Sequence, residues 1–376
     1  MGGTLNALGV VRSLAHGRMP IYLLETTRLC AASWSRYCKY VAVPALEGRG
    51  LIDSLIALAE LLTCRPVLIL TSDECVNCVS AYRREIEAHY RISLPSEAVV
   101  RALADKAMFQ ALAERERFVV PRAVCVNHVA NLELLRNLRP PLIIKPADKT
   151  LVLKGIVERA VRVETLHEAQ RVGTQMLSCA PSVVVQEWVD GPDTELFFTL
   201  FSCDRSSNLL GLFTGRKLLC TPPGIGSTAV CVAAPEVARE LLAPTMQFIT
   251  RVEYRGLGSL EFKRDRRSGR FVIIEPTVGR TDWQEEIATL CGVNLPLRTY
   301  MSELECHSPP IAAASPRLAW RSSVGFRTPL AAGMRAVDGY FRWSDPLPAL
   351  YYYVYERWVE RIQRVVRALT NRTAPL

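Results

Sequence analysis

The sequence predicts an α/β fold with more than one domain. Short apolar runs typical of strands alternate with helical periodicity over roughly the first 95 residues, which favours a small parallel sheet. Residues 258–275 instead predict two antiparallel strands joined by a short basic turn. The 376 residues suffice for two or three domains, and 49% hydrophobic with 22% charged residues is a globular composition.

The N-terminal part is expected to form a Rossmann-like domain over residues 1–95. Its predicted elements are a helix at 7–15, strands at 20–24 and 40–44, a helix at 50–63 and a buried strand at 65–70. Gly2, Gly3 and Gly9 are typical of the first turn of such a unit, but no strand precedes them. We therefore expect the first strand to be missing, either lost or encoded upstream.

The middle of the chain continues to alternate between strands and helices. Asp105 is a good N-cap for a helix that begins at Lys106. Strands are predicted at 118–125, 141–146, 182–189, 195–202 and 209–219, followed by a loop at 222–227 and a helix at 235–253. The loop contains two prolines and two glycines, and we expect it to be mobile.

The hairpin at residues 258–275 carries one acid in each strand. Glu261 and Glu275 lie among apolar neighbours, and a carboxylate within a strand core is costly unless something binds it. Two carboxylates on adjacent antiparallel strands also repel each other unless a cation lies between them. Mg²⁺ bound by one or two carboxylates together with substrate phosphates fits this pattern. The alternative is a hairpin whose acids face solvent.

The composition changes beyond Glu305. Residues 307–316 are rich in Pro, Ala and Ser and predict a linker, and residues 350–369 predict a long helix rich in aromatic residues and arginine. This helix either packs on the body of the protein or lies against a membrane surface or a partner. We assign residues 306–376 to a linker and a C-terminal helical extension.

The net charge of +9 favours anionic partners. The basic residues are scattered without a long run, so a nucleic-acid groove is not expected. Few of the 46 basic residues are lysines, and a lysine is a compact point charge that suits phosphate. The lysines are Lys39, Lys106, Lys145, Lys149, Lys154, Lys217 and Lys263.

We expect a cytoplasmic protein. Its 12 cysteines stand mostly alone in apolar surroundings, which is typical of reduced and buried thiols. No apolar run approaches the roughly 20 residues that cross a bilayer, and the chain does not begin with a recognisable signal peptide. The sequence leaves oligomer formation open.

Taken in order, these segments resemble the ATP-grasp superfamily of ATP-dependent carboxylate–amine ligases over roughly residues 1–300. The matching motifs are Asp105-Lys106, the strand 141–146, the segment 186–195 and the acids Glu261 and Glu275. Residues 215–228 are most similar to D-aspartate-ligase-like and carbamoyl-phosphate-synthetase-like members. The resemblance implies an ATP-grasp fold at residues 96–305, built of two α+β subdomains that divide near residue 185.

The resemblance further implies that ATP and Mg²⁺ bind between these subdomains. Lys106 and Lys145 would neutralise phosphates, whereas the alternative for each is an ordinary surface lysine. The backbone of residues 188–189 would contact the adenine edge. The implied nucleotide-binding residues are Lys106, Lys145, Gln186, Glu187, Trp188, Val189 and Glu195. Strand alternation would leave one of the two glutamates on the surface.

Metal and catalytic roles follow from the same resemblance. Glu261, Glu275 and Thr277 would hold Mg²⁺. Arg280 would contact the transferred phosphate or the acyl-phosphate oxygen, a charge that suits its planar fork. Arg216 and Lys217 would face the phosphates and the acceptor substrate as part of a closing lid. The implied catalytic residues are Arg280, Lys217 and Arg216.

Two features depart from the family pattern. Most members have an asparagine at the position of Thr277, and a threonine offers Mg²⁺ only a hydroxyl. The loop at residues 147–155 lacks the usual glycine run, so Lys149 or backbone amides would have to replace it. Both features are compatible with a weakened or repurposed site.

The implied reaction transfers the γ-phosphate of ATP to a small carboxylate, and a small amine then attacks the acyl phosphate to form an amide. Catalysis would rest on positioning and charge neutralisation. Two alternatives stay open. One is a non-catalytic nucleotide-binding scaffold, and the other is a biotin-carboxylase-like enzyme that activates bicarbonate.

Overall fold

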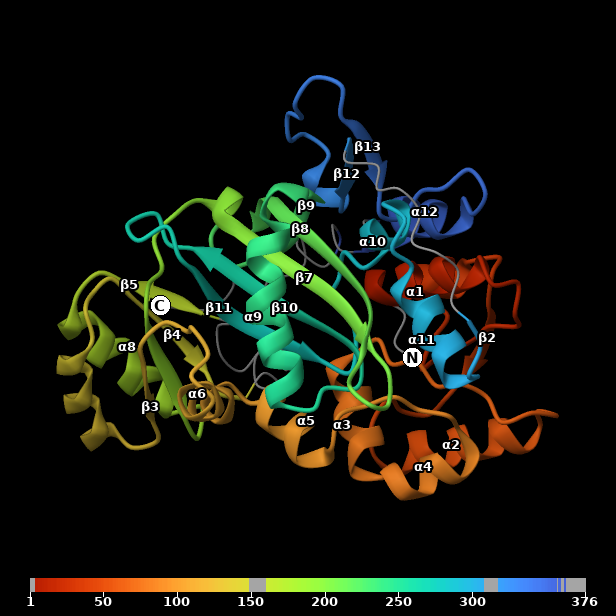
Figure 1. Ribbon diagram of the computed structural model, residues 1–376, viewed down its shortest axis with the longest axis horizontal. Coiled ribbons are helices and arrows are strands. Elements are labelled where there is room, and N and C mark those ends of the chain that lie inside the picture. Colours follow the sequence, from red (N-terminus) through yellow and green to blue (C-terminus); the bar gives the residue numbers. More distant parts are fainter. Residues whose placement is uncertain (1–3, 149–159, 308–316, 357, 360–361, 363–376) are drawn as a thin grey trace.

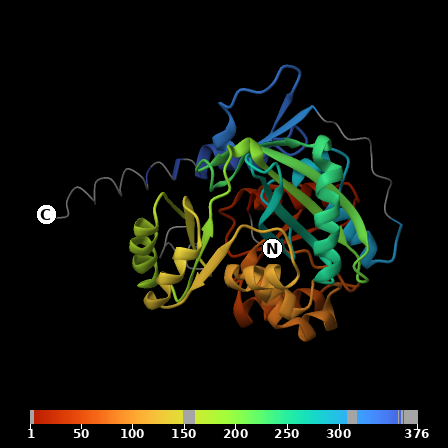
Figure 2. The same ribbon diagram turned by 60° about the vertical axis from the view of Figure 1, so that its left-hand side comes forward.

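The computed structural model describes residues 4–148, 160–307, 317–356, 358–359 and 362. A large sheet forms the centre of the molecule, a smaller sheet lies in a separate lobe, and the N-terminal helices pack beside the large sheet (Figures 1 and 2). The mixed α/β fold class is therefore confirmed. The phosphate-side loop at 149–155 and the linker at 308–316 lie outside the described residues.

The N-terminal part has a parallel strand pair surrounded by helices. Its elements are α1 (Leu5–Ala15), β1 (Tyr22–Glu25), β2 (Lys39–Ala42), α2 (Gly48–Glu60), α3 (Asp73–Ala81), α4 (Arg83–His89) and α5 (Glu97–Ala104), with a 3-10 turn at Ala31–Trp34. The parallel pairing of β1 with β2 confirms the expected parallel arrangement. The prediction of a strand at 65–70 is wrong. This segment forms a single isolated bridge, from Val67 to Arg91, and not a strand.

The small lobe holds a four-stranded antiparallel sheet in the order β3-β6-β4-β5. Its elements are α6 (Lys106–Arg115), β3 (Ala123–Val126), the 3-10 helix Val129–Asn137, β4 (Leu142–Pro146), β5 (Val161–Val163), α8 (Leu166–Leu177) and β6 (Val183–Glu187). Asp105 caps α6 as predicted, accepting a hydrogen bond from the Met108 N–H at 2.8 Å. Alternation along β4 buries Leu142 and Ile144 beneath α8 and leaves Ile143 and Lys145 on the other face.

The large sheet has the strand order β11-β10-β7-β8-β9-β12-β13. Its strands are β7 (Leu196–Cys203), β8 (Leu209–Thr221), β9 (Ser227–Ala233), β10 (Gly256–Arg264), β11 (Phe271–Val278), β12 (Leu318–Arg321) and β13 (Arg335–Asp338), and a 3-10 turn at Asp193–Glu195 leads into them. The accompanying helices are α9 (Ala238–Arg251), preceded by a 3-10 turn at Pro235–Val237, α10 (Glu286–Leu290) and α11 (Leu295–Glu303). The α9 helix covers one face, and α1, α10 and α11 pack on the other.

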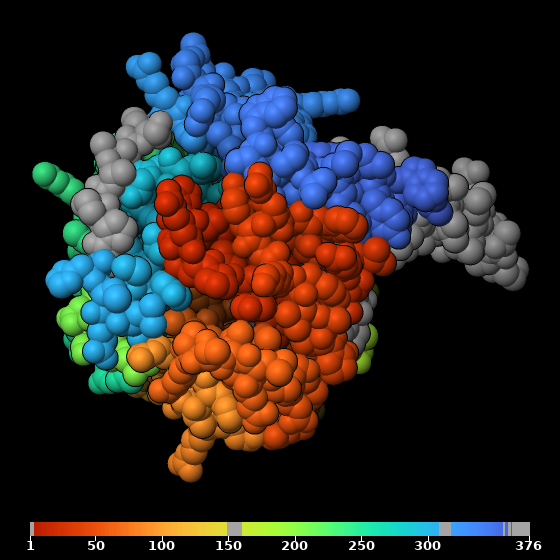
Figure 3. Space-filling model, turned by 90° about the vertical axis from the view of Figure 1, so that its right-hand side faces the viewer, coloured from red at the N-terminus to blue at the C-terminus, as the bar shows by residue number. Residues whose placement is uncertain are grey.

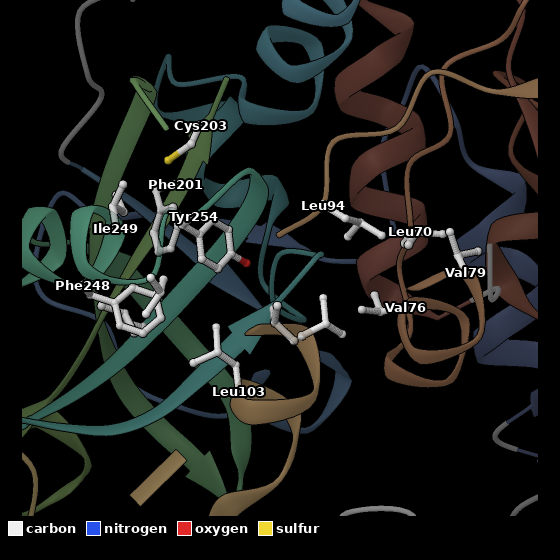
Figure 4. Packing of buried hydrophobic residues seen from close by; sticks show 14 of the residues in the cluster. Leu70, Val76, Val79, Leu94, Leu103, Phe201, Cys203, Phe248, Ile249 and Tyr254 are labelled. Carbon is white, nitrogen blue, oxygen red and sulfur yellow. The ribbon is translucent and has the colours of Figure 1, made fainter. Parts of the chain in front are cut away.

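One hydrophobic core joins the large sheet to the N-terminal helices. Figure 4 shows Phe201, Phe248 and Tyr254 packed between α9 and the sheet, with Val76 and Leu94 continuing the same cluster toward α3. Phe201 and Tyr254 meet edge to face at 5.0 Å between ring centroids. The N-terminal part is therefore fixed to the sheet by burial.

The C-terminal segment differs from the expectation of a linker followed by a helix. β12 and β13 extend the large sheet beyond β9. A 3-10 turn at Ser323–Gly325 follows β12 in the chain. The predicted helix at 350–369 is described only as α12 (Leu347–Tyr351), the π turn Tyr352–Glu356 and three further residues. Trp34 stacks on Tyr351 at 5.5 Å between ring centroids, so this segment packs on the N-terminal part, as Figure 3 shows.

None of the helices in the described part of the chain is long and apolar enough to cross a membrane. All 12 cysteines are free thiols.

A buried charge cluster links α1, α10 and the C-terminal segment. Arg12 Nε lies 3.0 Å from Asp345 Oδ2, and Arg342 Nη2 lies 2.7 Å from Glu286 Oε2. Neighbouring Glu285 is fully buried and accepts a hydrogen bond from the Ser13 hydroxyl at 3.2 Å. Burial, together with the charge of Glu286, raises the pKa of Glu285 to about 8.

We predict that Glu285→Gln flattens the dependence of folding stability on pH. A carboxyl whose pKa is raised on folding stabilises the native state fully below its unfolded pKa, and this stability is lost as the pH rises toward about 8. Each pKa unit is worth about 1.4 kcal/mol, so the native chain should lose a few kcal/mol between pH 5 and pH 8. The glutamine variant does not titrate at this position and should lose much less stability over the same pH range.

Urea unfolding at both pH values measures the effect, with exposed Glu60→Gln as the control. Equal pH profiles for the native chain and the Glu285 variant would contradict the assignment.

Candidate functional site

A pocket of about 670 Å³, including its open mouth, lies between the small lobe and the large sheet. Such a volume suits a small-molecule ligand. The predicted residues that line it are Lys106, Lys145, Gln186, Glu187, Trp188, Val189, Glu261 and Glu275. The fold therefore brings together motifs that are up to 169 residues apart in the chain, from Lys106 to Glu275.

The two acids of the hairpin meet at one end of this pocket. Glu261 on β10 stands directly opposite Glu275 on β11, as the sequence predicted. The register shifts just beyond this pair, so that Ile274 is an extra residue in β11, and both Ile274 and Glu275 line the pocket. A bulge of this kind re-aims side chains next to a site.

Each acid has a lysine close by. The buried Lys217 Nζ donates to Glu261 Oε2, and Lys106 Nζ lies 4.0 Å from Glu275 Oε1. Burial lowers the pKa of Lys217 while Glu261 raises it, and the net pKa lies above the ordinary lysine value. Lys217 therefore stays charged and offsets the repulsion between the carboxylates.

Gly215 makes room for the residues beneath this acid pair. A Cβ at Gly215 would come within 2.2 Å of the Phe198 ring, which packs below it. Phe198 is fully buried and pairs across the sheet with Glu261. The small residue two positions before Lys217 therefore lets an aromatic ring support the strand that carries Glu261.

The two carboxylates are suitable ligands for a Mg²⁺ ion that phosphate oxygens also bind. The described residues contain no cluster of three or more His, Cys, Asp or Glu side chains that could enclose a metal. Two pocket-facing carboxylates are what Mg²⁺ uses when phosphates and water complete its coordination. Thr277 lies on the same hairpin, and its hydroxyl donates to Asp282 Oδ1 at 2.7 Å. Asp282 is a neighbouring acid that the sequence analysis did not single out.

The opposite end of the pocket contains the hinge after β6. Lys145 lies nearer the acid end, where it lines a second hollow together with Lys106 and Glu275, and its Nζ donates to Gln186 Oε1 at 3.4 Å. The Trp188 N–H donates to the Pro141 carbonyl at 2.9 Å and is therefore engaged within the protein. Among the described residues the Val189 N–H has no hydrogen-bond acceptor, which leaves it as the backbone donor at this end.

Both predicted glutamates have partners outside the pocket. Glu187 pairs across the sheet with Leu142, on the α8 face, and its carboxylate accepts the Arg139 N–H at 3.0 Å. Glu195 accepts a hydrogen bond from Arg264 Nε at 2.7 Å and does not line the pocket. Both carboxylates therefore accept hydrogen bonds from local donors, and of the two residues Glu187 lines the pocket.

Arg216 also differs from the expectation. Because successive residues of a strand point to opposite faces, Arg216 points away from the side of Lys217. Its guanidinium lies over the Phe197 ring at 5.9 Å and pairs with Glu236 at 3.6 Å, beside the start of α9. This geometry excludes Arg216 from the acid pair.

Arg280 connects the end of the hairpin to the N-terminal part. Its Nε donates to Asp73 Oδ1 at 2.6 Å and its Nη1 to the Thr281 carbonyl at 2.9 Å. Burial lowers its pKa, but Asp73 and the nearby acids Asp282 and Glu275 raise it, and the net pKa lies above the ordinary value. Gly279, at φ +71°, makes the turn that brings Arg280 to α3.

Asp193 is a site residue that the sequence analysis missed. Its carboxylate accepts the Cys220 N–H at 2.6 Å and the Gly224 N–H at 2.7 Å. These bonds hold the loop at 222–227 over the pocket. Three residues of that loop line the pocket, namely Gly224, Ile225 and Gly226. The only signal was an acid within the turn DGPDTE, where acids commonly serve local backbone bonds.

No family model matches the chain. It is 21% identical over 315 residues to the D-aspartate ligase of Enterococcus faecium (strain Aus0004), which covers 78% of this chain and 73% of that protein.

Solved structures with the same fold include an ADP complex of N5-carboxyaminoimidazole ribonucleotide synthetase. That structure matches with a TM-score of 0.66 and 12% identity, over 83% of this chain and 78% of that one. The biotin carboxylase domain of Hydrogenobacter thermophilus 2-oxoglutarate carboxylase, solved with MgADP and bicarbonate, matches with a TM-score of 0.64 and 13% identity, over 84% and 70% of the two chains. These likenesses show that the chain has the ATP-grasp fold.

Proposed function

We propose that this protein is an ATP-dependent ligase that joins a small carboxylate to a small amine through an acyl phosphate. The observation that carries the proposal is the Glu261–Glu275 pair, which faces a pocket that also holds Lys106 and Lys145. Two acids and two lysines at one end of a half-apolar pocket suit a metal-bound nucleoside triphosphate. The likeness to a D-aspartate ligase supports the reaction class.

The proposed reaction has two steps. An oxygen of the substrate carboxylate attacks the γ-phosphorus of ATP, and ADP leaves with the electrons of the broken P–O bond. The amine then attacks the acyl carbon, phosphate leaves, and the nitrogen loses a proton. Lys106 and Lys145 would neutralise the phosphates, and the Glu261–Glu275 pair would hold Mg²⁺. The metal would stabilise negative charge on the transferred phosphate.

Two further residues would position this machinery. Lys217, itself buried, holds Glu261 in place by an ion pair. Arg280 would contact the transferred phosphate, and Asp73 would orient its guanidinium from α3. The N-terminal part would thereby contribute to the site through a positioning residue.

A non-catalytic nucleotide-binding protein is the second candidate. The hydroxyl of Thr277 donates to Asp282, and the carboxylates of Glu187 and Glu195 are bound elsewhere, so fewer groups than expected surround the nucleotide. Phosphate release from Mg-ATP, measured with a panel of amino acids and small carboxylates, separates the two candidates. Carboxylate-dependent release supports the ligase, whereas nucleotide binding without release across the panel supports the scaffold.

We predict that Glu275→Gln abolishes turnover and weakens binding of MgADP more than that of metal-free ADP. The amide keeps the shape of the side chain but removes the charge that holds the metal. The difference should exceed about tenfold, or 1.4 kcal/mol. Calorimetric titration with and without Mg²⁺ measures it.

Glu236→Gln, on the opposite face of the sheet, is the matched control and should behave as the native chain does. The metal assignment fails if Glu275→Gln hydrolyses ATP at the native rate.

We predict that Arg280→Lys lowers kcat by on the order of 10²-fold, the scale of losing one transition-state donor, and leaves ATP affinity nearly unchanged. A lysine cannot reproduce the two-pronged contact of a guanidinium. Steady-state kinetics on the carboxylate that supports turnover would measure both quantities.

Arg216→Lys is the control, because that arginine points away from the acid pair. The melting temperature should also be recorded, since Arg280 pairs with Asp73 of α3. If kcat falls by less than about twofold in the folded variant, Arg280 has only a structural role.

We predict that Asp193→Asn raises the KM for ATP about tenfold with a smaller effect on kcat. The change removes a charged acceptor that binds two loop amides, and such bonds are worth about 1.5–3 kcal/mol. Asp190→Asn, an exposed neighbour, should leave both constants unchanged. An unaltered KM in the Asp193 variant would show that the loop does not cover the nucleotide.

A further inference from the structure

Lys263 is a buried cation for which the described part of the chain supplies no hydrogen-bond acceptor. Its residue surface is 3% exposed, and its Nζ has no hydrogen-bond partner among the described residues. An ammonium group has three donors and no acceptor, so burying it without a partner costs several kcal/mol. Burial lowers the pKa of Lys263, and the charge of Asp193 opposes this.

Neighbouring carboxylates are already engaged. Asp193 accepts two backbone amides of the β8–β9 region, and Glu261 accepts from Lys217. Lys263 also lies over the Trp188 ring, whose centroid is 4.6 Å from its Nζ. A ring face attracts a cation but offers no acceptor lone pair. The described residues therefore leave this acceptor to be supplied by a ligand in the pocket that Lys263 lines.

The position of Lys263 indicates which part of a ligand supplies that acceptor. Lys263 lies two residues beyond Glu261 on β10, so both side chains share the pocket face, and both line the pocket. Its cross-strand neighbour is Leu196, at the end of the pocket that Trp188 and Val189 form. The acids and phosphate-binding lysines occupy the other end.

We propose that Lys263 is a specificity-determining residue that donates a hydrogen bond to a ring nitrogen of the nucleotide base. This inference rests on the proposed nucleotide binding. Adenine carries ring-nitrogen acceptors at its edges, and Trp188 provides an aromatic wall at the same end of the pocket. The Val189 N–H supplies the second donor at the same end.

The test compares ADP with ribose 5-diphosphate, which has the sugar and both phosphates but no base. Lys263→Met keeps the length of the side chain and its packing against Trp188, but removes all three donors. It should weaken ADP binding 10- to 100-fold, the range expected for a hydrogen bond to a charged group. Binding of ribose 5-diphosphate should change by less than about twofold. Calorimetric titration measures both ligands.

Lys39→Met, which removes an exposed lysine, is the matched control and should leave both affinities unchanged. The unliganded Lys263→Met variant should melt at the native temperature or above, because an apolar group replaces an unpaired buried charge. A lower melting temperature together with normal ADP binding would overturn the inference and assign Lys263 to the core.

Equal losses for both ligands would place the contact at the ribose or phosphates and also overturn the inference. Failure of the native chain to bind ADP would instead overturn the proposed function together with the inference. ADP binding by the native chain that Lys263→Met leaves intact defeats the inference alone.

Discussion

The site is organised around the repulsion between two carboxylates. Glu261 and Glu275 are fixed opposite each other by the register of an antiparallel pair, so neither can move away without breaking strand pairing. Lys217 and Lys106 reduce this repulsion, one from β8, which β7 separates from β10, and one from the small lobe. Because Lys106 begins α6, the same electrostatic demand that shapes the hairpin also favours closure of the lobe over it.

The N-terminal part completes this arrangement by burial. Val76 and Leu94 belong to the core that also contains Phe201 and Phe248 of the ATP-grasp sheet. A shared core leaves little freedom for one part to move against the other, so Asp73 stays within reach of Arg280. Motion that admits and releases substrates would therefore have to come from the small lobe and the loop held by Asp193.

Much of the fold could be predicted from the sequence, because its signals are local. The hairpin, its acid pair and the N-cap at Asp105 each depend on a few adjacent residues. The failures depend on distant partners. β12 and β13 have four residues each, and their sheet position requires the edge of β9, more than 80 residues earlier in the chain. Residues 65–70 have the composition of a strand, but in the structure they form only a single bridge to another segment.

The site predictions follow the same division. The predicted residues lie together where the motif order was sufficient, as at Lys145 and Glu261, which both line the pocket. Strand alternation separates Arg216 from Lys217, and it turns Glu187 away from Gln186. The phase of alternation is not visible in an all-apolar strand, because both faces are buried and no polar pattern marks the pocket side.

Two sets of buried polar groups differ in whether the protein offsets the free-energy cost of burying them. Glu285, Glu286, Arg12 and Arg342 form a cluster in which hydrogen bonds and opposite charges offset the cost of burial. Lys263 is also buried, yet it has no such compensation from the described residues, and it lies in the wall of a pocket. A fold selected for stability alone would place an apolar residue there, as the fully buried Phe262 beside it illustrates. The unpaired Lys263 ammonium is therefore best explained by a ligand that supplies its hydrogen-bond acceptor.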